Sequence, residues 1–228
     1  MRRRARDGLR GSWGTVVVSQ DKLTVTKTQP MQDCVLKSIQ NEIWIGSLFP
    51  DFVVAPTAVR YAPPSVTTTM PYAGIDAWTL VTSKHRTFSD YARAKCIGRL
   101  AKIFVAMSSA GILVQDVKPN NMCVYPLTDY DLKLIDTGMF CSYIHFHSHV
   151  DDTGLKWHDY VPQGRGVWPL TPDSIEEFYA YSLKKHLVFF FSGSPSHPHP
   201  YRFVPPHLTP LLRIKKISDV TPGFCGIW

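Results

Sequence analysis

Residues 111–124 read GILVQDVKPNNMCV, and this stretch decides the fold. Both of its ends are short apolar runs of the kind that form buried strands. Between them lies a polar loop that carries a carboxylate, an ammonium group and an amide, on Asp116, Lys118 and Asn121. The pattern therefore predicts a polar site held between two apolar elements.

A second piece, LKLIDTG at residues 132–138, belongs with the first. Its Asp136 follows an alternating apolar strand and precedes a glycine. Two carboxylates, an amide and a lysine are the groups that phosphoryl transfer from a nucleotide with Mg²⁺ requires. One carboxylate orients the attacking hydroxyl, the other carboxylate and the amide hold the metal, and the lysine neutralises the moving phosphoryl group. The residue types thus indicate phosphoryl-transfer chemistry.

The composition is that of a folded protein with one domain or two small lobes. The chain has 228 residues, of which 44% are hydrophobic and 19% charged, so it can bury a sizeable core. Its formal net charge of +7 favours an anionic partner. Nucleotide phosphates, acidic proteins and nucleic acid all meet that description, and charge alone does not choose among them.

The five cysteines are odd in number and form no CxxC pair. This argues against a disulfide framework or a zinc site and favours a reducing compartment, so we expect an intracellular protein of the cytoplasm or nucleus. No apolar segment follows the basic residues 1–7, and no apolar run is long enough to span a bilayer, so we expect no membrane partner. Residues 1–7 are interpreted as a solvated basic tail, with nuclear targeting or nucleic-acid contact as alternatives.

Hydrophobic periodicity and turn residues predict the remaining elements. In chain order these are a β-hairpin over residues 8–27, a helix that begins near Asp33 as a possible N-cap and ends near Gly46, strands over 52–55, 58–61 and 65–70, helices over 89–110 and 173–191, and an amphipathic segment over 208–217. Strands therefore dominate the first part and helices the second, with a boundary near residues 71–76. This order predicts an α+β fold.

The two opening pieces resemble the catalytic and metal-binding loops of eukaryotic-type protein kinases. Residues 116–121 match Asp-x-Lys-Pro-x-Asn at each defining position, and residues 136–138 resemble the Asp-Phe-Gly loop. The lysine and proline are typical of Ser/Thr kinases, and the short chain is similar to the compact, divergent kinase-like proteins of large DNA viruses. The resemblance implies a bilobal fold with a small antiparallel β lobe over residues 8–74 and a shortened, mainly helical lobe over 75–228. A viral protein of this kind would act in the host cell.

The resemblance also implies roles for the polar residues. Asp116 would be the catalytic base and Lys118 would contact the γ-phosphate of ATP. Asn121 and Asp136 would bind Mg²⁺.

Nucleotide binding is assigned by the same resemblance to the first lobe. Lys27 would contact phosphate and pair with Glu42 on the following helix. The other residues assigned to ATP are Gly11 and Gly14 in a glycine-rich loop, Val16 over the adenine, and Met70 and Tyr72 in a hinge at residues 69–72. Asp76 would face the ribose. The lysine at position 118 favours a protein Ser/Thr substrate over a small molecule.

Departures from the kinase pattern keep other functions open. Leu9 occupies the position of the first glycine of the glycine-rich loop. Val114-Gln115 replaces the His-Arg that precedes the catalytic aspartate in kinases, and Thr137 replaces the phenylalanine of the Asp-Phe-Gly loop. Gln115 implies that activity does not need phosphorylation of an activation loop. The main alternative is a pseudokinase, a binding module that holds nucleotide or partner proteins with little transfer. A third function, binding of nucleic acid, is supported only by the net charge and the basic residues 1–6 and is less favoured.

Three histidines alternate at 145, 147 and 149, so on a strand they would share one face. They are compatible with a metal site, but without a nearby cysteine we interpret them as part of an exposed loop.

Overall fold

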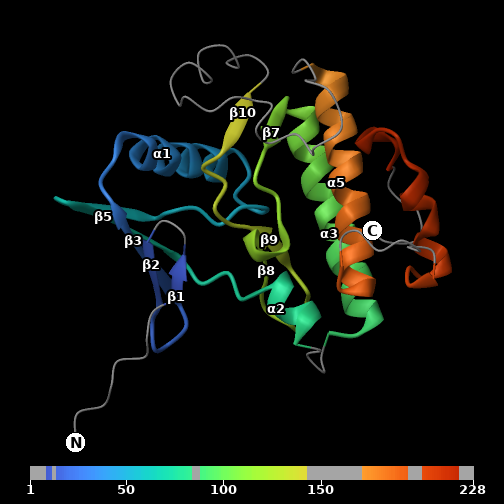
Figure 1. The fold of residues 1–228 in the computed structure, drawn as a ribbon, viewed down its shortest axis with the longest axis horizontal. Helices are drawn as coiled ribbons and strands as arrows, with labels where there is room; N and C mark the ends of the chain where they lie inside the picture. Colours follow the sequence, from blue (N-terminus) through green and yellow to red (C-terminus); the bar gives the residue numbers. More distant parts are fainter. Residues whose placement is uncertain (1–8, 12–13, 84–87, 143–170, 195–201, 221–228) are drawn as a thin grey trace, which may run out of the picture. The chain divides into compact units, whose positions relative to one another are not determined.

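The structure, a computed structural model shown in Figure 1, describes the following residues: 9–11, 14–83, 88–142, 171–194 and 202–220. They form small antiparallel sheets and several helices, so the predicted α+β class is confirmed. The chain divides into two compact units, residues 1–73 with 136–138 and residues 74–135 with 139–228. The segment Asp136–Gly138 therefore belongs with the first unit, although the predicted linear boundaries assigned it to residues 75–228.

The first unit contains a five-stranded antiparallel sheet with the order β1-β2-β3-β5-β4. Its strands are β1 (Leu9–Gly11), β2 (Gly14–Val18), β3 (Thr24–Pro30), β4 (Ala58–Ala62) and β5 (Ser65–Pro71). The predicted hairpin is confirmed in β2 and β3, and its turn is closed by Asp21, which accepts hydrogen bonds from the Ser19 hydroxyl and the Leu23 amide. The predicted strands over 58–61 and 65–70 are confirmed as β4 and β5.

Helix α1 (Asp33–Leu48) packs against this sheet (Figure 1). Val35 and Ile39 are buried together with Val66 of β5, which is why apolar residues recur here at helical spacing. The N-cap is Gln32, so the prediction of Asp33 was wrong by one residue, and Asp33 lies in the first turn, where a helix favours negative charge.

The sequence predicted that Gly46 would end or loosen α1, but the helix continues for two more residues, to Leu48. The glycine is needed instead for close packing, since a Cβ at this position would lie 2.2 Å from the Cβ of Ala55. The predicted strand over residues 52–55 is also wrong. There the amides of Phe52 and Val53 donate to the Phe49 carbonyl in a turn, and the buried Val53 forms only an isolated β-bridge, so this apolar run makes no strand.

The second unit contains two small sheets. One has the order β6-β8-β9, formed by β6 (Ile75–Asp76), β8 (Met122–Val124) and β9 (Leu132–Leu134). The other pairs β7 (Ile112–Val114) with β10 (Phe140–Ser142). Strands β7 and β8 are the two apolar ends of the opening stretch, and the short 3-10 helix η1 (Pro119–Asn121) lies between them. All residues of β7 and β8 are buried, as the apolar runs predicted.

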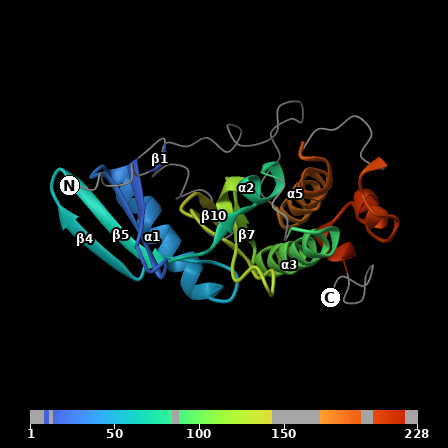
Figure 2. The ribbon, with the colours of Figure 1, turned by 90° about the horizontal axis from the view of Figure 1, so that it is seen from below.

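The α-helices in the described part of this unit are α2 (Ala77–Thr82), α3 (Asp90–Ser109) and α5 (Pro172–Ser192). The two long predicted helices are confirmed as α3 and α5, which lie side by side in Figures 1 and 2. Ser89 caps α3 by accepting a hydrogen bond from the Ala92 amide. Helix α5 begins one residue earlier than predicted because Thr171 and Ser174 form a capping box at its start.

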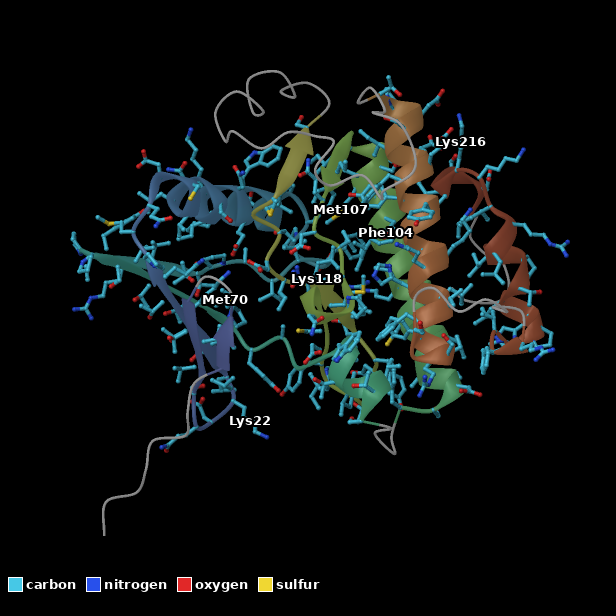
Figure 3. The ribbon with its side chains drawn as sticks, in the orientation of Figure 1. Lys22, Met70, Phe104, Met107, Lys118 and Lys216 are labelled. Atoms are coloured by element: carbon cyan, nitrogen blue, oxygen red, sulfur yellow. The ribbon has the colours of Figure 1, made fainter. Side chains whose placement is uncertain are left out.

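Aromatic packing joins α3 to α5. The rings of Phe104 and Tyr179 have centroids 4.7 Å apart, and the Tyr179 hydroxyl lies 3.6 Å from the sulfur of Met107. Phe104 and Met107, labelled in Figure 3, thus mark the place where α3 meets α5. The predicted amphipathic segment forms two 3-10 helices, η4 (Pro206–Arg213) and η5 (Ile217–Asp219), which bury Leu208, Leu211 and Ile217.

Some predictions lie outside the described residues. These are the basic tail at residues 1–7 and the exposed loop with the three histidines at 145, 147 and 149. In the part of the chain that the structure describes, none of the helices combines the length and the apolar character needed to cross a membrane.

Candidate functional site

The structure brings the three predicted residues of the Asp116 loop together. The ammonium group of Lys118 lies 2.6 Å from Oδ2 of Asp116. The Asn121 amide donates to the same oxygen at 3.2 Å and to the Asp116 backbone carbonyl at 2.9 Å. One carboxylate oxygen therefore faces two donors, and among the described residues the second oxygen, Oδ1, accepts no hydrogen bond, so it could orient a further donor such as a substrate hydroxyl.

Backbone hydrogen bonds hold this loop on both sides. The backbone amide of Asn121 donates to the Lys118 carbonyl and closes η1. The backbone amide of Ile135 donates to the backbone carbonyl of Asn121. The Gln115 amide donates to the carbonyl of Met139. Asn121 is buried, so its side chain is a structural support of Asp116 as well as a candidate metal ligand.

Tyr179 supports the strand that leads into this loop, and sequence reasoning did not identify it. Its hydroxyl donates to the Ile112 carbonyl at 2.9 Å and accepts from the Val114 amide at 3.1 Å. Burial raises the pKa of this hydroxyl, so it stays protonated. Val114 occupies the position of the histidine in the kinase pattern, and Tyr179 of α5 supplies hydrogen bonds to β7 at this point.

A second cluster lies in the first unit and contains Lys27, Asp136 and Glu42. The Lys27 ammonium lies 2.7 Å from Oδ1 of Asp136. Glu42 is only 3% exposed, and this burial, assisted by the charge of Asp136 and opposed by that of Lys27, raises its carboxyl pKa to about 7. Asp136 also favours the protonated form of Glu42, because a protonated carboxyl can donate a hydrogen bond to a neighbouring carboxylate.

The ion pair of Lys27 differs from the predicted one. We expected Glu42 as its partner, but the structure pairs Lys27 with Asp136. The reason is the cost of burying charge, because the Asp136 side chain keeps 44% of its surface exposed while Glu42 is almost fully covered. Burial by itself would lower the pKa of Lys27, but the charges of Asp136 and Glu42 outweigh it and raise that pKa.

Helix α1 holds the segment Asp136–Gly138, and this contact was also missed from the sequence. The Asn41 side-chain amide donates to the Gly138 carbonyl at 3.1 Å. A Cβ on Gly138 would lie 1.9 Å from the hydroxyl oxygen of Ser38, so only glycine fits against the helix. The available signal was the spacing of Ser38, Asn41 and Glu42, which places three polar residues on one face of a helix.

Several residues assigned to nucleotide share one face of the five-stranded sheet. In the strand register Val16 is opposite Lys27, and Val25 is opposite Met70, which is labelled in Figure 3. Because side chains alternate along a strand, Val16, Lys27 and Met70 point to the same side. Tyr72 follows β5, and its amide donates to the Leu23 carbonyl.

The two glycines of the candidate loop pair with each other at the end of the β1-β2 hairpin, where Gly11 is opposite Gly14. Gly14 is required by the fold, since a Cβ would lie 2.2 Å from the Thr28 carbonyl oxygen. Asp76, which the sequence placed near ribose, uses its carboxylate to cap α2 by accepting from the amide and hydroxyl of Thr79.

Groups of three or more His, Cys, Asp or Glu side chains suited to a metal do not occur among the residues described above. Magnesium does not need such a group, because it is commonly bound by one or two carboxylates together with substrate phosphates and water. Asp136 and Asn121 have the oxygen ligands that suit this ion. No protein-family model matches the chain, and no curated protein matches it.

Proposed function

We propose that the chain is an ATP- and Mg²⁺-dependent Ser/Thr protein kinase of a compact, divergent type, with a bilobal kinase-like fold. The observation that carries this proposal is the Asp116 cluster, in which Lys118 and Asn121 both contact one carboxylate oxygen at 2.6 and 3.2 Å. The cluster has the residue types and the local geometry that transfer of a phosphoryl group to a hydroxyl requires.

In the proposed reaction, Asp116 accepts the proton of a substrate Ser or Thr hydroxyl. The hydroxyl oxygen forms a bond to the γ-phosphorus as the bond from that phosphorus to the β-phosphate oxygen breaks, and ADP leaves. Lys118 neutralises charge on the transferred group. When bound, Mg²⁺ would neutralise the phosphates, with Asn121 and Asp136 as its protein ligands.

The first unit supplies the proposed nucleotide contacts. Lys27 carries the positive charge suited to phosphate, and the apolar side chains of Val16 and Met70 share its face of the sheet and suit an adenine ring. The proposal requires that this face and the Asp116 cluster act on the same ATP molecule, so substitutions in either unit should weaken ATP binding.

A pseudokinase is the second candidate, and the Lys27–Asp136 ion pair favours it. At 2.7 Å, the lysine already neutralises the carboxylate that would bind metal. In this reading the chain holds nucleotide or a partner protein without transferring phosphate.

Transfer of [γ-³²P]phosphate to the protein itself or to a basic generic substrate separates the two functions. We expect Asp116→Asn to lower the rate by about 100-fold or more, the usual contribution of a general base. Asp129→Asn, at an exposed aspartate of the same unit, serves as the matched control and should keep wild-type activity. Equal incorporation by wild type and Asp116→Asn would contradict the kinase proposal, and ATP binding without transfer by either protein would support the pseudokinase.

Thermal-shift measurements with ATP, with and without Mg²⁺, test whether Asn121 and Asp136 bind the metal. Stabilisation by ATP should require Mg²⁺ if Asn121 and Asp136 bind it, and metal-independent stabilisation would count against both roles.

A further inference from the structure

One face of α1 carries three polar residues that all contact the segment Asp136–Gly138. Ser38, Asn41 and Glu42, which we call the α1 polar stripe, are spaced so that a helix places them side by side. Ser38 lies against Gly138, the Asn41 side-chain amide donates to the Gly138 carbonyl at 3.1 Å, and Glu42 is near enough to Asp136 for their charges to interact. The helix and the segment belong to the same compact unit.

We infer that Asn41 is a positioning residue, whose hydrogen bond to Gly138 fixes the segment Asp136–Gly138 on α1 and so sets the place of the Asp136 carboxylate. The inference deepens the proposed function and rests on it, because that function assigns Asp136 to Mg²⁺.

The backbone of this segment needs such support. Asp136 has a φ of 56°, in the left-handed region that side chains other than glycine rarely adopt. A residue in this conformation persists only when contacts around it hold the chain in place. Before Asp136, the Ile135 amide is bonded to the Asn121 carbonyl, and after it, Asn41 holds the Gly138 carbonyl.

Gly138 makes the Asn41 contact possible. Because any Cβ would collide with Ser38, only a glycine lets the segment lie directly against α1. The Ser38 contact therefore fixes the approach, while the Asn41 hydrogen bond fixes the direction of the peptide group. Lys27 holds only the side chain of Asp136, so it does not replace this backbone contact.

Two variants test the role of Asn41. Asn41→Leu keeps the approximate size and removes the donor. Asn41→Asp keeps the shape and sets an oxygen against the carbonyl of Gly138, which provides a second variant should the leucine protein not fold. Asn41→Gln retains a side-chain amide and should therefore keep part of the wild-type protection of residues 136–139 against hydrogen exchange. Gln40→Leu, at the neighbouring exposed amide of α1, is the matched control.

The first measurement is amide hydrogen exchange in the ligand-free protein. We expect residues 136–139 to exchange about fivefold faster in Asn41→Leu, the change expected from losing one hydrogen bond of ordinary net strength. The second measurement is the apparent affinity for Mn²⁺ in the presence of ATP, determined by electron paramagnetic resonance. This affinity should weaken in Asn41→Leu by about the same factor. Gln40→Leu should leave both quantities unchanged.

Unchanged exchange at residues 136–139 would overturn the inference. Faster exchange with unchanged Mn²⁺ affinity would overturn it too, because the hydrogen bond would then serve only the fold. A wild-type protein that binds ATP but no Mn²⁺ would contradict the proposed function itself, and the positioning role would fall with it. The exchange measurement on ligand-free protein distinguishes these failures.

Discussion

Replacing Glu42 with glutamine should stabilise the protein at neutral and alkaline pH. Glu42 is 3% exposed, and burial raises its carboxyl pKa from 4.5 to about 7. Above that pH the folded protein must hold a buried negative charge. Glutamine has nearly the same shape, carries no charge, and offers an amide that can donate to Asp136 as the protonated carboxyl does.

The magnitude follows from the difference in pKa between the folded and unfolded states. The pKa rises from 4.5 to about 7, and each pKa unit corresponds to about 1.4 kcal/mol, so the full effect is about 3 kcal/mol. Between these two pH values the folded state binds more protons at Glu42 than the unfolded state does. The free energy of unfolding contributed by Glu42 therefore falls as pH rises through this window and is constant outside it.

Urea unfolding at pH 5, 6, 7 and 8 measures this effect. The stability of Glu42→Gln relative to wild type should increase with pH and level off above pH 7 at about 3 kcal/mol over its acid value. Glu177→Gln, at an exposed glutamate, should follow wild type at every pH. Parallel curves for Glu42→Gln and wild type would refute the reasoning, as would a glutamine variant less stable than wild type at pH 8, which would mean that ionised Glu42 is held favourably by Lys27.

Three further substitutions test individual contacts through the free energy of unfolding. Thr137 is 1% exposed and its hydroxyl has no hydrogen-bond partner among the described residues, so Thr137→Val should stabilise by about 1 kcal/mol, and a loss of stability would reveal a partner. Tyr179→Phe should destabilise by about 1–3 kcal/mol because two backbone groups of β7 lose their partner; unchanged stability in urea would contradict this. Gly138→Ala should also cost about 1–3 kcal/mol through its collision with Ser38, and a melting temperature equal to wild type would show that the helix yields easily.

The Asp116 cluster was predictable because its contacts are local. Lys118 and Asn121 are two and five residues from Asp116, and the flanking apolar runs force the chain to turn between two buried strands. The cap of α3 at Ser89 is local in the same way, since a serine side chain can satisfy a free amide at the start of a helix. Where two residues in contact are only a few positions apart in the sequence, their types and spacing nearly determine the contact.

The contacts of Asp136 could not be predicted in the same way. Lys27 and Asp136 are 109 residues apart, and Asn41 is 97 residues from Gly138, so these contacts depend on how α1 and β3 pack in three dimensions. The incorrect strand at residues 52–55 has a related cause. A short apolar run shows that a segment is buried but does not show whether its backbone joins a sheet.

The partner of Lys27 is decided by burial, which the sequence does not display. From the sequence, Lys27, Glu42 and Asp136 are three formal charges, and either carboxylate could pair with the lysine. In the structure the more exposed Asp136 keeps its charge and pairs at 2.7 Å, while burial favours a protonated Glu42 below about pH 7. The cluster then holds one positive and one negative charge with a neutral third group, an arrangement that avoids leaving an unpaired charge in the interior. The same argument makes Glu42 the residue at which the charge of this cluster changes with pH.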